Sequence, residues 1–125
     1  MAAVGAKVWV GRVISGLVCL LLTFSAVMKL KGGPELEQGF AHMGVPISMR
    51  VPLAILELSV VAVYAIPATA VLGGILLAGF MGGAILTHWR IGDPFVVQVT
   101  VGLLGWLALY LREPRLKDLI PLRKP

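Results

Sequence analysis

The chain has 125 residues, of which 58% are hydrophobic and only 14% are charged, and its mean hydropathy is +0.95. A soluble domain carries about 25% charged residues, so this chain has too few to cover a soluble surface, and one domain in lipid is expected. The 11 Lys and Arg against 6 Asp and Glu give a net charge of +5, but the basic residues stand between apolar runs and at the C-terminus, which favours a role in membrane orientation over nucleic-acid binding.

The first apolar segment covers about residues 8–30, near the ~20 residues that span a bilayer core. Only helices and closed barrels satisfy the backbone in lipid, and a run without alternation indicates a helix. Lys7 and the small residues of "FSAV" also suit a cleaved signal peptide, but the run is long and three more follow, so we expect a retained helix.

Cys19 is the single cysteine, which excludes an intramolecular disulfide and argues against a Cys-based metal site.

The next segment predicts a short helix in the membrane interface. Gly32–Gly33 ends the first helix, and Pro34 suits the first position of a new one. Leu36, Phe40 and Met43 then recur at helical spacing, while the charged residues lie elsewhere on the circumference. This pattern is typical of an amphipathic helix lying on the membrane.

Three further spans are expected at about residues 48–66, 68–89 and 94–111. The first two of these are joined by a short turn around Pro67. The last opens with Asp93–Pro94, which we interpret as an N-cap followed by proline at the first helical position.

The span at 68–89 is rich in glycine. Gly79 and Gly83 form a GxxxG pair, and Ala78 and Gly82 form a second small-xxx-small pair. Small residues let helices approach closely, so this span is predicted to lie at the centre of the bundle or of a homodimer.

Four spans place both termini on one side of the membrane, and the basic residues indicate which side. The side of the termini carries Lys7, Arg12, Arg112, Arg115, Lys117, Arg123 and Lys124, and the opposite side carries Lys29, Lys31, Arg50 and Arg90. Both termini are therefore expected in the cytoplasm. The sequence predicts an all-α integral membrane protein: a four-transmembrane-helix bundle with a short interfacial helix between helices 1 and 2, a single membrane domain over residues 1–125, and a basic cytoplasmic tail at 112–125.

Glu57 is an ionisable residue inside the apolar run "VPLAILELSV". It lies nine residues before Ile66, or ~13 Å from the nearer turn. A charge near mid-membrane costs roughly 2.5–3.5 kcal/mol on insertion scales, so such residues face the bundle interior, pair, and mark functional sites. A purely structural ion pair is the alternative.

Partners for Glu57 follow from the direction of helical side chains, which lean toward the N-terminus of their helix. Glu57 and Lys29 lie on antiparallel spans and lean toward each other, and the long Lys stem bridges the difference in level. Ser25 lies one turn from Lys29 on the same face. The same logic aims His88 and Gln98 at one another.

Arg50, Glu57 and Tyr64 recur every seven residues and form one polar stripe. The predicted ligand pocket comprises Ser25, Lys29, Arg50, Glu57, Tyr64, His88 and Gln98. Simpler roles are also open: the basic residues Lys29, Arg50 and Arg90 as interfacial anchors, Tyr64 as part of an aromatic belt, and His88 as a solvated residue at a helix end.

The motifs "FSAVMKL", "LAILELSVVAVYAIP" and "GAILTHWRIGDPF", together with the four-helix layout, resemble the DoxX-like family of small bacterial membrane proteins, from about Val13 to Leu111. The resemblance implies a four-helix fold in the bacterial cytoplasmic (inner) membrane and marks Lys29, Glu57 and His88 as the family's polar signature. The family takes its name from a subunit of a quinone-linked thiosulfate oxidoreductase, and relatives act as redox-associated accessories or assembly helpers. This chain lacks the cysteines that a thiol-redox member needs.

Three functions fit these residues. The favoured one is an accessory or binding protein that holds a quinone, an isoprenoid or another lipid-like molecule in the pocket around Glu57. The second is an acid–base enzyme, an isomerase, cyclase or epoxide-opening enzyme, with Glu57 and His88 or Lys29 as catalytic groups. The third is a small proton-coupled transporter.

A haem held by His42 and His88 is disfavoured, because one of the two lies on the interfacial helix. No metal site is expected, the cofactor is unknown, and the expected partners are the lipid bilayer, an apolar small molecule and a second copy of the chain.

Overall fold

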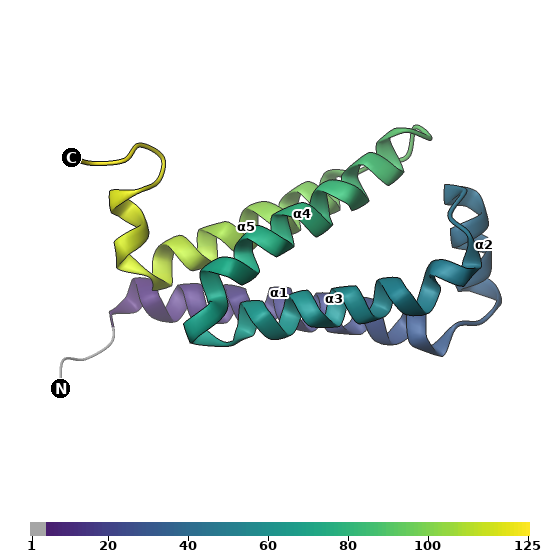
Figure 1. The fold of residues 1–125 in the computed structure, drawn as a ribbon, viewed down its shortest axis with the longest axis horizontal. Coiled ribbons are helices and arrows are strands. Elements are labelled where there is room, and N and C mark those ends of the chain that lie inside the picture. The colour runs from purple at the N-terminus through teal and green to yellow at the C-terminus, as the bar shows by residue number, and fades with distance from the viewer. Residues whose placement is uncertain (1–4) are drawn as a thin grey trace.

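The computed structural model describes residues 5–125, which form helices joined by short turns (Figure 1). The helices are α1 (Ala6–Lys31), α2 (Pro34–Met43), η1 (Ile47–Met49), α3 (Arg50–Ala65), η2 (Pro67–Thr69), α4 (Ala70–Trp89), α5 (Val96–Arg112) and η3 (Pro114–Asp118). The four long helices form a ring, in which α1 packs on α3 and α5, and α4 packs on the same two helices. The predicted all-α architecture is confirmed for these residues.

Three helical stretches, Ala6–Lys31, Ile47–Ala65 and Pro67–Trp89, are long and apolar enough to cross a membrane. The remaining long helix, α5, is apolar but shorter, with 17 residues. Large apolar side chains cover the outside of the ring: Leu20 is 69% exposed and Leu103 is 67% exposed. An apolar outer surface of this extent would be unfavourable in water, and it suits a helix bundle surrounded by lipid.

The boundaries of the four long helices fall within two residues of the predicted ones, but the N-cap of α5 is a different residue. Its N-cap is Phe95 rather than Asp93. The Asp93 carboxylate instead accepts a hydrogen bond of 2.8 Å from the His42 ring nitrogen Nε2 of α2. The N-cap prediction at Asp93 is therefore wrong, because a contact with another helix takes the side chain that the cap requires.

The short helix predicted between the first two spans is α2, with Pro34 in its first turn as expected. Gly32 and Gly33 precede it with φ angles of +70° and +113°, which residues with a side chain rarely adopt. These two glycines let the chain turn sharply out of α1, so that α2 lies across one end of the bundle (Figure 1). We call this the open end, and the end where α1 begins and α5 finishes the closed end.

At the closed end the helices approach very closely. A Cβ atom on Gly73 of α4 would overlap the backbone of Tyr64 of α3, and one on Gly11 of α1 would lie 2.7 Å from the carbonyl oxygen of Ala108 of α5. The absence of side chains at these positions brings the helices together. From this end the α1–α3 pair and the α4–α5 pair diverge toward α2 (Figure 1).

The glycines predicted to pack, Gly79, Gly82 and Gly83, lie farther along α4, where the helices have separated. Apart from their chain neighbours and the backbone of α4 itself, no atom among residues 5–125 lies within 4 Å of a Cβ built on any of them. The prediction that they form a helix contact inside the bundle is therefore wrong for one copy of the chain. Their use in a homodimer stays a prediction.

Candidate functional site

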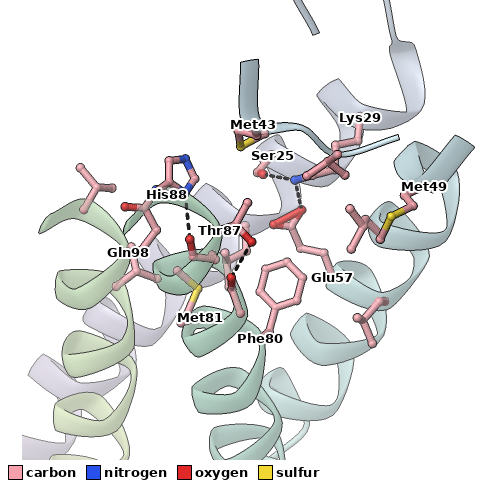
Figure 2. Close-up of a pocket in the computed structure, with 18 of the residues that line it drawn as sticks. Ser25, Lys29, Met43, Met49, Glu57, Phe80, Met81, Thr87, His88 and Gln98 are labelled. Atoms are coloured by element: carbon pink, nitrogen blue, oxygen red, sulfur yellow. Dashed lines mark hydrogen bonds and ion pairs between the residues drawn. The ribbon is translucent and has the colours of Figure 1, made fainter. Parts of the chain in front are cut away.

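The diverging helices enclose a cavity of about 500 Å³ at the open end, within the usual size range of small-molecule sites. Its wall is mainly apolar and comes from α1, α2, α3, α4, α5 and the segment between α2 and α3 (Figure 2). The polar side chains in this wall are Ser25, Lys29, Glu57, Thr87, His88 and Gln98.

Lys29 and Glu57 form an ion pair in this wall, as the direction of their side chains predicts. The Lys29 Nζ atom lies 3.0 Å from Glu57 Oε1, and the two side chains are 18% and 2% exposed. Lys29 also donates a hydrogen bond of 2.8 Å to Ser25 Oγ, one turn earlier on α1. Figure 2 shows these three groups meeting between α1 and α3. The ion pair neutralises a carboxylate that would be costly to bury alone.

Arg50 holds the backbone that carries Lys29. Its Nη1 atom donates hydrogen bonds of 2.6 and 2.7 Å to the carbonyl oxygens of Lys29 and Leu30. The last carbonyls of a helix have no partner within the helix, so a cation there is favourable. Arg50 at the start of α3 thus ties the end of α1 to α3 and fixes the level at which Lys29 meets Glu57.

The opposite wall carries His88 on α4 and Gln98 on α5. His88 Nδ1 lies 2.8 Å from the carbonyl oxygen of Ala84. Because a carbonyl only accepts, Nδ1 carries a proton, which leaves Nε2 as an acceptor in the neutral ring. The buried Oε1 atom of Gln98 has no hydrogen-bond partner among residues 5–125. The two side chains line one cavity as predicted, but no hydrogen bond joins them in this part of the chain.

The short helix α2 forms the outer wall of the cavity. Phe40 and Met43 line it, and Phe40 is 3% exposed. Two contacts hold α2 against the turn between α4 and α5: the His42–Asp93 hydrogen bond, and a hydrogen bond from Arg90 to the carbonyl oxygen of Met43. One face of α2 therefore packs against the rest of the protein.

Two of the predicted pocket residues lie outside the cavity. Arg50 bonds the end of α1, as described above. Tyr64 lies near the closed end, where its hydroxyl donates a hydrogen bond of 2.7 Å to the Gly105 carbonyl oxygen and lies 3.2 Å from Ser15 Oγ. Its role is to join α1, α3 and α5, so the prediction that it lines the pocket is wrong.

The sequence analysis did not identify most of the α4 wall. Phe80, Ala84 and Thr87 line the cavity beside His88, and they recur at i, i+4, i+7 and i+8. That spacing marks one helix face, and it could have been found from His88 outward. The wide separation of α3 and α4, which turns this face into a wall, has no comparable sequence signal.

The site offers a charged pair, an imidazole and an amide in an otherwise apolar wall. Among residues 5–125 no three His, Cys, Asp or Glu side chains lie close enough together to hold a metal ion. Chemically, the arrangement suits an apolar molecule with a polar group that reaches Glu57 and Lys29.

The comparison with protein families agrees with the motifs around these residues. The family model described as the DoxX-like family matches residues 13–110. No curated protein and no solved structure matches the chain. The matched segment begins in α1, ends in α5 and includes Lys29, Glu57 and His88. The chain belongs to the DoxX-like family.

Proposed function

We propose that this protein binds an apolar small molecule, a quinone, an isoprenoid or a related lipid, in the cavity at its open end. The observation that carries the proposal is the ion pair of Lys29 and Glu57 in the wall of a 500 Å³ cavity that is otherwise mainly apolar. Ionisable residues inside a membrane bundle are rare and usually functional. Pockets with a few convergent polar groups in an apolar wall are typical of small-molecule sites.

The proposed setting is the bacterial cytoplasmic membrane, with four spans and both termini in the cytoplasm. The α5 helix has 17 residues, so it rises about 26 Å, which is close to the hydrocarbon thickness of a bilayer. The basic residues of the closed end and the C-terminal tail support the cytoplasmic placement of that end. Family membership supports a role as an accessory component of a membrane redox system.

The test is mass spectrometry of organic extracts from the purified wild type, Glu57→Gln and Ser59→Ala, all in one detergent. Ser59 is an exposed residue of α3 outside the cavity, and its hydroxyl bonds only its own helix, so Ser59→Ala is the matched control. We expect a defined molecule in the wild type and the control that is absent from the folded Glu57→Gln variant. Extracts that carry no specific molecule in any variant would reduce the Lys29–Glu57 pair to a structural contact.

A membrane-embedded acid–base enzyme is the second candidate, and His88 favours it. With Nδ1 bound to the Ala84 carbonyl, the His88 Nε2 atom is left to exchange a proton with a bound molecule. Glu57 or Lys29 would be its counterpart. The same extracts separate the candidates: an enzyme gives a product in the wild type and its precursor in Glu57→Gln, the two differing by isomerisation, ring closure or addition of water.

A further inference from the structure

Within the described chain, Lys29 and Glu57 each keep one hydrogen-bonding group without a partner, and these two groups determine which chemical group a ligand can place beside them. Glu57 Oε1 accepts from Lys29, and no group among residues 5–125 bonds the second carboxylate oxygen, Oε2. An ammonium group carries three N–H bonds. Ser25 and Glu57 take two of those on Lys29. One acceptor and one donor thus remain side by side, because the ion pair holds the two groups 3.0 Å apart.

The charge of this centre restricts the head further. Lys29 and Glu57 carry opposite charges and are joined in one pair, so the pair as a whole has no net charge to offer. An anionic head would meet the Glu57 carboxylate, and a cationic head would meet the Lys29 ammonium, each with little water to screen the repulsion. The site therefore suits a neutral head.

Among neutral oxygen groups, a carbonyl or an ether only accepts hydrogen bonds, whereas a hydroxyl both donates and accepts. A carbonyl here would bond Lys29 and leave Glu57 Oε2 without a donor. A hydroxyl bonds both. We infer that the head of the ligand is a neutral hydroxyl, an alcohol or a phenol, which donates to Glu57 Oε2 and accepts from Lys29 Nζ. This inference rests on the proposed function of the cavity and specifies its ligand class.

The position of Glu57 gives the orientation of the ligand. The α3 helix runs from the open end toward the closed end, and Glu57 is the last of its residues to line the cavity. The carboxylate meets Lys29 on the α1–α3 side of the cavity, across from His88 and Gln98 (Figure 2). The hydroxyl therefore lies on this side, and the apolar body extends from it across the cavity toward α4. Leu56 of α3 and Gly79 and Gly83 of α4 line the cavity and are exposed. The body of the ligand can thus reach the surrounding lipid between α3 and α4.

The test uses four probes that share one isoprenoid chain: farnesol, farnesyl methyl ether, farnesal and farnesoic acid. Equal amounts are offered together to the detergent-solubilised full chain, and native mass spectrometry measures which are retained. We expect wild type to retain farnesol about tenfold more than the ether or the aldehyde, because each of those leaves a charged acceptor unpaired. Farnesoic acid should be retained least.

The decisive variant is the double substitution Lys29→Met with Glu57→Leu, which removes both charges together and so avoids an unpaired charge. It should still retain the ether, which shows an intact cavity, and its tenfold preference for farnesol should fall to about equal retention. Ser59→Ala, the control on α3, should keep the preference of the wild type.

Equal retention of farnesol and its ether by the wild type would overturn the hydroxyl inference and leave the proposed function standing. The same holds if organic extracts of the wild type yield a specific ligand without a hydroxyl group. A farnesol preference that survives in the double variant would also overturn the inference, because the preference would then arise elsewhere. Retention of none of the probes, together with extracts that carry no specific molecule, would overturn the proposed function itself.

Discussion

At the scale of single residues, the two members of the Lys29–Glu57 pair differ in how well they tolerate the loss of the other. Glu57 is 2% exposed on a mid-helix position, whereas the Lys29 side chain is 18% exposed near the end of α1. An ammonium on a long stem can reach the membrane interface, but the short carboxylate cannot. The loss of Lys29 should therefore be the more harmful of the two.

We predict that Lys29→Met lowers the free energy of unfolding by about 3 kcal/mol, because it leaves a buried carboxylate unpaired. Glu57→Leu should lower it by less, and the double variant should recover most of the loss. The measurement is a double-mutant cycle from reversible unfolding in mixed detergent micelles. If the two single effects simply add in the double variant, the pair is not energetically coupled.

The sequence was sufficient to predict the Lys29–Glu57 pair because antiparallel helices lean their side chains toward each other. The sequence wrongly placed Arg50 and Tyr64 in the pocket, because a seven-residue repeat shows that residues share one face of a helix but not how far along the bundle each one lies. Residues seven apart stand about 10 Å apart along the axis. The stripe from Arg50 to Tyr64 therefore runs from the open end to the closed end, and only Glu57 reaches the cavity.

At the scale of the helices, the glycines of α4 divide into two classes that respond oppositely to an added methyl group. Gly83→Ala places the methyl where no described atom outside the neighbouring backbone of α4 lies within 4 Å, whereas Gly73→Ala places it against the Tyr64 backbone. We expect Gly83→Ala to raise the free energy of unfolding by about 0.5–1 kcal/mol, since alanine loses less entropy in a helix.

Gly73→Ala should lower the free energy of unfolding by about 1–3 kcal/mol, because α3 and α4 must separate to admit the methyl group. Both variants are compared in the same unfolding assay as the charged pair. A loss of stability in Gly83→Ala would mean that this surface packs against another helix, as in the homodimer that the GxxxG spacing suggests. Sequence spacing alone could not separate the two classes, because it does not reveal where neighbouring helices diverge.

At the scale of the whole molecule, the distribution of charge predicts the orientation in the membrane. The closed end carries Arg12 and Arg112, and the C-terminal segment adds Arg115, Arg123 and Lys124. At the open end, Arg50 and Arg90 bond backbone carbonyls. Basic residues are therefore more numerous at the closed end and in the C-terminal segment than at the open end, which favours the cytoplasmic side for the closed end.

We expect green fluorescent protein fused after Pro125 to fluoresce in bacterial cells, and alkaline phosphatase at the same position to stay inactive. Insertion of the same reporters at Gly44, in the turn after α2, should give the opposite pattern. A fluorescent fusion at Gly44 together with an active phosphatase after Pro125 would place the termini outside the cytoplasm and would reverse the proposed orientation.

The short helix α2 also limits how far the two helix pairs can separate at the open end. It is covalently joined to α1 and α3, and its bonds through His42 and Met43 reach the turn between α4 and α5. The α1–α3 and α4–α5 pairs are thus held together at both ends, by the glycine contacts at the closed end and by α2 at the open end. A ligand wider than the present cavity can enter only if the contacts of His42 and Met43 break and the two helix pairs separate. The strength of these two contacts therefore limits the width of the ligands that the protein admits.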